Sequence, residues 1–304
     1  MESVWMPEAW GRDAFLALAA IAQVTDRVKL GTGIVNVYSR SPATLAMSTA
    51  TLDELSNGRA VLGLGSSGPG VVERWHGINY ERPLDRVREA TEIIRLALSG
   101  ATTNFHGSFF HVSDFKLAMK SPKHTIPIYV AALSSKMLQL AGEIGDGVLL
   151  YIRPLQTIHN ALKEVAKGAD KGGKSLDNFD IAAFLPTAIS ENRAEAASTV
   201  ARVIAYYVGG MGTYYRRLIS QTGFASEADM IDEAWQRGDK QAATDAVTER
   251  LMDSVALVGS TDECRGKLEK FRNQGVTLPI LSLTNLSGHA ATDFCQTIKR
   301  MMMD

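Results

Sequence analysis

Four segments of this sequence place small residues and polar groups where a strand is predicted to end. The first contains Glu8, which follows a predicted strand and is flanked in the chain by Trp5 and Trp10. A carboxylate beside tryptophan rings can be desolvated, which raises its pKa and suits it to acid–base chemistry. An acidic residue attracted to the positive end of a helix dipole is the competing explanation for Glu8.

The second segment, Leu30–Pro42, has two glycines one residue apart, Gly31 and Gly33, at the end of a strand. Glycines so placed let the backbone bulge or approach a flat ligand closely. Asn36 and Ser39 add hydrogen-bonding groups at the same edge. The pattern is explained about equally well by a strand end that glycine makes flexible and that binds no ligand.

The third segment, Gly63–Trp75, follows a strand with Ser66, Ser67 and Gly68. Its hydroxyl and free N–H groups suit a ligand at the carboxyl end of a barrel strand. The competing explanation is a helix N-terminus capped by Ser67.

In the fourth segment, Ile128–Met137, a strand of small residues leads directly into a helix through Ser134 and Ser135. Free N–H groups at the start of a helix, together with serine hydroxyls, can bind a phosphate. A capping serine alone is more often structural. Three such edges on neighbouring strands favour a ligand site.

Strands and helices alternate along the chain. Most of the strands are apolar at consecutive positions, as in parallel strands that are covered by helices on both faces. The predicted strands are Glu2–Met6, Lys29–Val35, Ala60–Gly65, Ile126–Leu133, Gly147–Ile152, Phe179–Ile189 and Thr277–Thr284. Amphipathic periodicity predicts helices at Asp13–Gln23, Leu84–Ser99 and Ser135–Ile144.

This alternation predicts an α/β fold, either a doubly wound sheet or a (β/α)8 barrel. No G-x-G-x-x-G motif follows the first strand, so a Rossmann dinucleotide site is not supported. We expect a barrel, with one strand unaccounted for. We expect a single domain over residues 1–304, with a largely helical insertion at about Asn192–Val258 whose part at Tyr206–Tyr215 shapes a pocket.

Composition argues against several classes of function. The 32 Lys and Arg residues balance 33 Asp and Glu residues, so we expect no nucleic-acid partner. The longest apolar stretch, Ala14–Ala22, is too short to span a membrane. The two cysteines, Cys264 and Cys295, fit a reducing cytoplasm. None of the 6 histidines has the spacing of a metal-ligand motif, so we expect no metal.

The sequence resembles the luciferase-like superfamily of flavin and deazaflavin oxidoreductases, and within it the coenzyme F420-dependent branch that includes methylenetetrahydromethanopterin reductase. The stretches that carry the resemblance are Trp5–Asp13, Leu30–Pro42, Leu52–Arg59, Gly63–Gly77 and Val208–Gly212. The resemblance implies a (β/α)8 barrel. Family members begin with a further strand and helix before the segment that matches Glu2–Met6, and we expect that unit to be absent here.

The resemblance also implies the residues of a site. A cis peptide bond at Gly33–Ile34 would form a bulge behind a tricyclic ring, and Glu8 and Trp10 would face its reacting side as catalytic residues. The implied cofactor-binding residues are Gly33, Ile34, Asn36, Ser66, Ser67, Gly68, Ala131, Ala132, Leu133, Ser134 and Ser135.

The activity implied by the resemblance is hydride transfer between reduced coenzyme F420, an 8-hydroxy-5-deazaflavin, and an organic electrophile such as 5,10-methylenetetrahydromethanopterin or a related C1-pterin. An FMN-dependent monooxygenase is the alternative within the superfamily. A truncated, non-catalytic barrel is a third hypothesis, motivated by the absent first unit. We expect a small-molecule substrate, no membrane association and, from the family, a homodimer.

Overall fold

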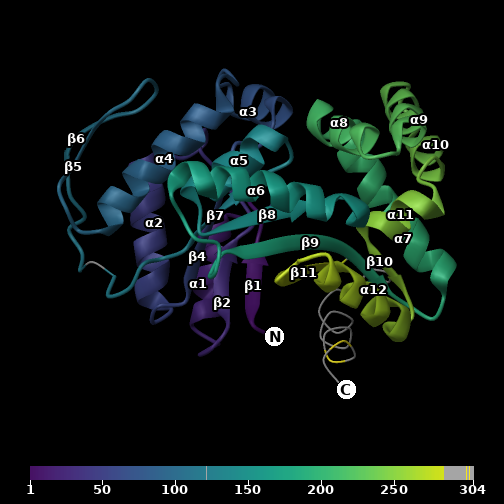
Figure 1. The fold of residues 1–304 in the computed structure, drawn as a ribbon, viewed down its shortest axis with the longest axis horizontal. Coiled ribbons are helices and arrows are strands. Elements are labelled where there is room, and N and C mark those ends of the chain that lie inside the picture. Colours follow the sequence, from purple (N-terminus) through teal and green to yellow (C-terminus); the bar gives the residue numbers. More distant parts are fainter. Residues whose placement is uncertain (121, 284–298, 300, 302–304) are drawn as a thin grey trace. The chain divides into compact units, whose positions relative to one another are not determined.

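The computed structural model describes residues 1–120, 122–283, 299 and 301, and it divides into two compact units (Figure 1). Unit 1 comprises Met1–Leu149 and Glu164–Phe179, and unit 2 comprises Leu150–Lys163 and Asp180–Asp304. The predicted strand end Thr284 and Cys295 lie outside the described residues.

Unit 1 contains a parallel sheet in the order β1-β2-β4-β7-β8, with the short strand β3 also paired to β4. The bounds are β1 Ser3–Met6, β2 Lys29–Thr32, β3 Val35–Asn36, β4 Ala60–Gly65, β7 Ile128–Ala131 and β8 Gly147–Tyr151. All six residues of β4 are buried, as expected for a strand covered on both faces. The sequence therefore predicted these strands correctly, apart from the break between β2 and β3.

Three of the helices described in unit 1, α1, α2 and α5, begin after a residue whose side chain caps the helix. The helices of unit 1 are α1 Ala14–Ala22, α2 Pro42–Leu55, α3 Pro69–His76, α4 Pro83–Leu98, α5 Ser135–Ile144 and the later part of α6 Ile158–Gly172. Asp13, Ser41 and Ser134 each accept a backbone N–H three residues on, which satisfies a donor that the helix itself leaves unpaired. The three predicted helices are confirmed within one residue at each end.

A hairpin in unit 1, β5 Thr103–His106 with β6 His111–Phe115, was not predicted from the sequence. It is fixed to α4 by the buried carboxylate of Glu89, which accepts the backbone N–H groups of residues 108, 109 and 110. Because the anchor lies outside the hairpin itself, local strand patterning gives little sign of it.

Unit 2 contains β9 Asp180–Ile189 between β10 Leu257–Gly259 and β11 Leu278–Leu283, all parallel. Its helices are α7 Arg193–Ala205, α8 Thr213–Gln221, α9 Ala225–Gln236, α10 Lys240–Asp245, α11 Glu249–Val255 and α12 Thr261–Asn273, with a π-helical turn at Tyr206–Gly210. The insertion is helical as predicted. Strand β10 begins at Leu257, close to the approximate end predicted for the insertion.

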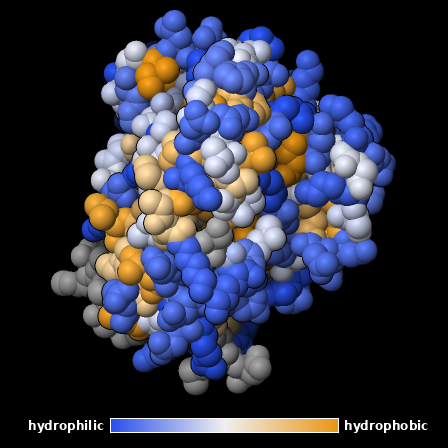
Figure 2. All heavy atoms as spheres, turned by 90° about the vertical axis from the view of Figure 1, so that its left-hand side faces the viewer, coloured by the Kyte–Doolittle hydropathy of each residue, from blue (hydrophilic) through white to orange (hydrophobic). Residues whose placement is uncertain are grey.

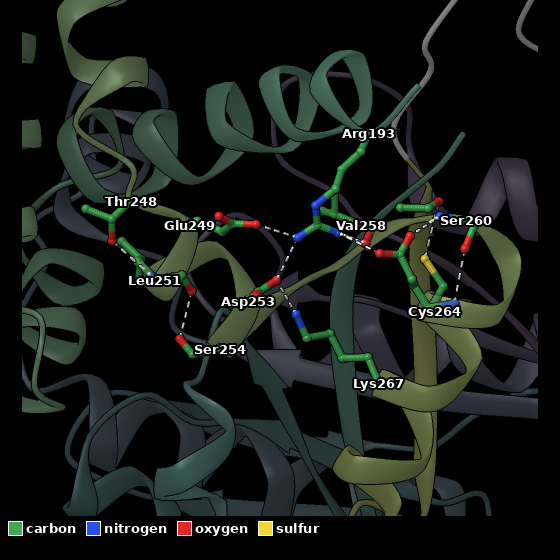
Figure 3. A network of polar contacts seen from close by, with 12 residues as sticks. Arg193, Thr248, Glu249, Leu251, Asp253, Ser254, Val258, Ser260, Cys264 and Lys267 are labelled. Atoms are coloured by element: carbon green, nitrogen blue, oxygen red, sulfur yellow. Dashed lines mark hydrogen bonds and ion pairs between the residues drawn. The ribbon is translucent and has the colours of Figure 1, made fainter. Parts of the chain in front are cut away.

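Arg193 joins several elements of unit 2 through a network of polar contacts (Figure 3). Its guanidinium donates to the Val258 carbonyl and to the Glu249 carboxylate at 2.8 Å, and it also pairs with Asp253 and Glu263. The hydrogen bond to Glu249 is the main reason that the pKa of Arg193 lies above its ordinary value. This network connects α7 with α11, β10 and α12.

Three further findings concern the described residues. No helix among them is long and apolar enough to cross a membrane. They include no cluster of three or more His, Cys, Asp or Glu side chains suited to a metal ion. Burial raises the pKa of the Cys264 thiol to about 11.

The string Leu52–Arg59 forms the end of α2 and the turn that leads into β4. Its last residue, Arg59, makes five hydrogen bonds, to the carbonyls of Ala22, Thr25, Val28 and Ser56 and to the Thr25 hydroxyl. These bonds hold the end of α1 and the start of β2 against the end of α2.

We predict that Arg59→Ala lowers the free energy of unfolding by about 2–4 kcal/mol, because it leaves several carbonyls without their donor. Denaturant unfolding followed by circular dichroism measures the change. The exposed residue Arg27 provides the control, and Arg27→Ala should change stability by less than about 0.5 kcal/mol. Equal stabilities of the two variants would contradict the role given to Arg59.

Candidate active site

Three strand ends meet in unit 1. The end of β4 lies between β3 and β7, with Asn36 paired to Gly65 and Leu64 paired to Val130. A Cβ atom built on Gly65 would lie 3.1 Å from the Ala131 Cβ and 3.2 Å from the Ile34 side chain. The three small-residue edges singled out in the sequence are thus brought side by side.

Gly63, two residues before Gly65 in β4, permits an even closer approach between β4 and the end of β2. A Cβ atom there would lie 1.9 Å from the carbonyl oxygen of Thr32, so no other residue fits without a shift of the backbone. The Thr32 hydroxyl donates to the Gly63 carbonyl and accepts the Gly63 N–H, both at 2.8 Å. This buried pair fixes the end of β2 against β4.

The peptide bond between Gly33 and Ile34 is cis, which confirms the expectation from the family resemblance. It stands where the predicted strand Lys29–Val35 is interrupted. The Gly33 N–H donates to the Met6 carbonyl, and the Glu8 N–H donates to the Ile34 carbonyl. The bulge is therefore held by the end of β1.

Asn36 is 2% exposed and has a side-chain oxygen that accepts the N–H groups of Tyr38 and Ser39. Its amide NH2 group has no hydrogen-bond partner among the described residues. This group is therefore available to a ligand at the end of β3.

The loop after β4 is shaped by its backbone. Ser67 adopts a left-handed conformation with φ of 56°, and the Ser66 hydroxyl lies 3.1 Å from the Tyr80 hydroxyl. The N-cap of α3 is Gly68, without a side-chain hydrogen bond. The alternative of a helix capped by Ser67 is therefore wrong.

The segment after β7 joins the sheet to α5. The Ala132 N–H donates to the Leu149 carbonyl, and Leu133 is half-buried. The exposed Ser134 caps α5 by accepting the Met137 N–H at 3.3 Å, and Ser135 is also exposed. Ser134 thus has a structural role, which leaves its hydroxyl hydrogen free to donate to an anion.

The carboxylate of Glu8 makes polar contacts with Arg40 and with the start of α1. It accepts two N–H groups of Arg40, at 2.8 and 2.9 Å, and the N–H of Ala14 at the start of α1. Trp10 packs edge-to-face on Trp75. The contact with α1 agrees with the helix-dipole explanation of Glu8.

Arg40 is the residue of this site that the sequence analysis missed. It also pairs with Asp13 at 2.5 Å, and its hydrogen bond to Glu8 is the main reason that its pKa is raised. Burial alone would raise the pKa of Asp13, but hydrogen bonds from Leu16 N–H and Arg40 outweigh it, so the pKa is lowered. Glu8 and Arg40 are 32 positions apart, so spacing alone gives no sign of the pair.

Unit 2 contains a cluster of tyrosines in and beside the π-helical turn. The ring of Tyr207 lies 4.7 Å from that of Tyr151 and 5.0 Å from that of Tyr215, all nearly perpendicular. Burial raises the pKa of all three phenols. They are therefore neutral hydrogen-bonding groups at physiological pH.

Residues 1–278 match the family described as luciferase-like monooxygenase. The chain is 33% identical to a 5,10-methylenetetrahydromethanopterin reductase of Archaeoglobus fulgidus, over 90% of this chain and 82% of that protein. It is 34% identical to the reductase of the same name from Methanolobus tindarius, over 91% and 84%.

A solved structure agrees with these matches. The coenzyme F420-dependent tetrahydromethanopterin reductase of Methanopyrus kandleri superposes with a TM-score of 0.82 at 27% identity, covering 93% of this chain and 85% of that one. The chain belongs to the luciferase-like monooxygenase family. The expected luciferase-like (β/α)8-barrel fold is confirmed.

We predict that the free energy of unfolding falls less at acidic pH in Arg40→Met than in the wild type. The lowered pKa of Asp13 means that its stabilising contribution is complete above its ordinary value of 3.8 and is lost as the pH falls through the folded-state pKa. Without Arg40, less stability should be lost as the pH falls from about 4 to about 2.

Thermal unfolding across this pH range measures the difference, and Arg27→Met serves as the control. Parallel pH profiles of the wild type and Arg40→Met would contradict the coupling between Arg40 and Asp13.

Proposed function

We propose that this chain is a coenzyme F420-dependent oxidoreductase that transfers a hydride between the reduced cofactor and an organic electrophile. The observation that carries the proposal is the meeting of three small-residue strand ends at Gly65, beside the bulge at Gly33–Ile34. The names of the similar reductases support the cofactor. They also support a methylene-bearing pterin, 5,10-methylenetetrahydromethanopterin or a related C1-pterin, as the substrate class.

The residues present fit a tricyclic ring with an anionic side chain. The side chain of Asn36 offers an amide donor at the end of β3. Gly33, Ile34, Ala131 and Ala132 would back the ring with little bulk. This assignment would place the polar edge of the ring at the NH2 group of Asn36.

The anionic part of the cofactor would lie along the two loops that follow β4 and β7. Ser66, Ser67 and Gly68 would hold the side chain, and Leu133, Ser134 and Ser135 would hold the phosphate. The exposed start of α5 has N–H groups that the helix does not satisfy, and these favour an anion.

When bound at the ends of β3, β4 and β7, the deazaflavin would supply a hydride from carbon in a two-electron step. Glu8 would contribute a negative charge, fixed in place by two N–H groups of Arg40, that stabilises a cationic electrophile such as an iminium. A preoriented charge of this kind needs no rearrangement during the reaction. Trp10 would cover the electrophile and exclude water.

The alternative enzyme is an FMN-dependent monooxygenase, which the family description favours. Both candidates use the same strand ends, so the choice depends on which cofactor binds. A chain that binds neither would support a non-catalytic barrel.

We predict that the purified chain binds coenzyme F420 at least tenfold more tightly than FMN and consumes no oxygen with the reduced cofactor. Fluorescence titration with each cofactor and an oxygen electrode provide the measurements. Tight retention of FMN together with oxygen consumption would overturn the proposal.

We also propose a homodimer in the cytoplasm. Helices α1 and α2 are in contact, and exposed apolar residues lie on both, with Leu16 on α1, Val24 just after its end, and Met47 and Leu55 on α2. Figure 2 shows apolar area on the face that carries α2 and α4. An apolar face can pair with its own copy about a twofold axis. Light scattering should give twice the chain mass of 32.9 kDa, and a monomeric mass would contradict the dimer.

A further inference from the structure

A cavity of about 640 Å³ lies in unit 1 beside Glu8. Its lining comes from the connection between β1 and α1, the start of α2 and the last residue of α3. Asn36 also lines it, so the cavity adjoins the strand end that we assign to the cofactor.

The charged side chains of this lining differ in whether they have an ion-pair partner. Glu8 and Asp13 share the single positive charge of Arg40, so one negative charge remains among these three side chains. Arg12 and His76 are exposed, and neither has an ion-pair or hydrogen-bond partner among the described residues. The guanidinium of Arg12 is therefore a cation that an incoming anion can pair with.

Two exposed tryptophans pack together beside the cavity, Trp10 in its lining and Trp75 against Trp10. Trp10 is 56% exposed and Trp75 is 48% exposed, and their rings meet edge-to-face with centroids 5.5 Å apart. Large apolar rings grouped at the surface beside a cavity are typical of a binding site. A planar ring of a ligand would bury them at little cost in conformational entropy.

The hydroxyl of Ser39 adds a polar group to the wall of the cavity. Its oxygen is buried and has no hydrogen-bond partner among the described residues. Buried hydroxyls are normally hydrogen-bonded, which makes this oxygen a candidate contact for a ligand.

We propose that this cavity binds an aromatic carboxylate portion of the substrate, with its ring against Trp10 and Trp75 and its carboxylate paired with Arg12. The link to the electrophile rests on the proposed function. A substrate that fits this cavity is an electrophile that carries an aromatic ring and a carboxylate at a distance from the reacting carbon. Binding energy from such a remote part helps to orient the reacting groups.

The test uses the full chain without cofactor and two probes of the same shape, benzoate and the neutral benzamide, in calorimetric titrations. We expect benzoate to bind about tenfold more tightly than benzamide, because only benzoate pairs with Arg12. Arg12→Gln should remove this preference, and Trp75→Ala should weaken both probes. Both residues are exposed, so circular dichroism should show that the variants stay folded.

The matched control is Arg27→Gln, which removes an exposed arginine outside the cavity and should leave benzoate binding unchanged. Equal binding of benzoate to wild type and Arg12→Gln would overturn the inference, as would no binding of benzoate up to about 50 mM. Because no cofactor is present, the result is independent of the proposed function. A chain that binds benzoate but not coenzyme F420 would contradict only the hydride-transfer proposal.

Discussion

The close approach of the ends of β2, β3, β4 and β7 is the constraint on which the site depends. Gly63 lies so close to Thr32 that a Cβ atom on it would be 1.9 Å from the Thr32 carbonyl oxygen. Gly65 lies against Ile34 and Ala131. Protein interiors are packed too tightly to absorb added volume at such contacts. Glycines here therefore determine where the bulge stands and how much space remains above the strand ends.

The polar groups of the site are positioned by this frame. Asn36 is carried by the strand that pairs with the end of β4, and Glu8 is tied to the bulge through its backbone N–H and to Arg40 through its carboxylate. Charges fixed in this way can stabilise a developing positive charge without reorganisation. The cavity beyond Glu8 extends the same surface toward Trp10 and His76, which suits a substrate larger than its reacting carbon.

Much of the fold could be predicted from the sequence because local patterns determine it. Continuous apolar runs predicted the strands β4 and β8, and amphipathic periodicity predicted the helices α1 and α5. The hairpin β5–β6 and the strand β10 were not predicted, because Glu89 and the pairing with β9 stabilise them from elsewhere in the chain. For the same reason the sequence indicated Glu8 but not its partner Arg40. The catalytic and cofactor-binding roles assigned to individual residues remain predictions.

The central claim, that the strand ends at Gly65 form the seat of the cofactor, is tested most directly by the affinity of Gly65→Val for coenzyme F420. The added side chain would fill space between Ile34 and Ala131, so we expect a loss of affinity of about tenfold or more in a folded protein. Gly266→Val is the control, because nothing lies within 4 Å of a Cβ atom at that position. Wild-type affinity in a folded Gly65→Val variant would contradict the account.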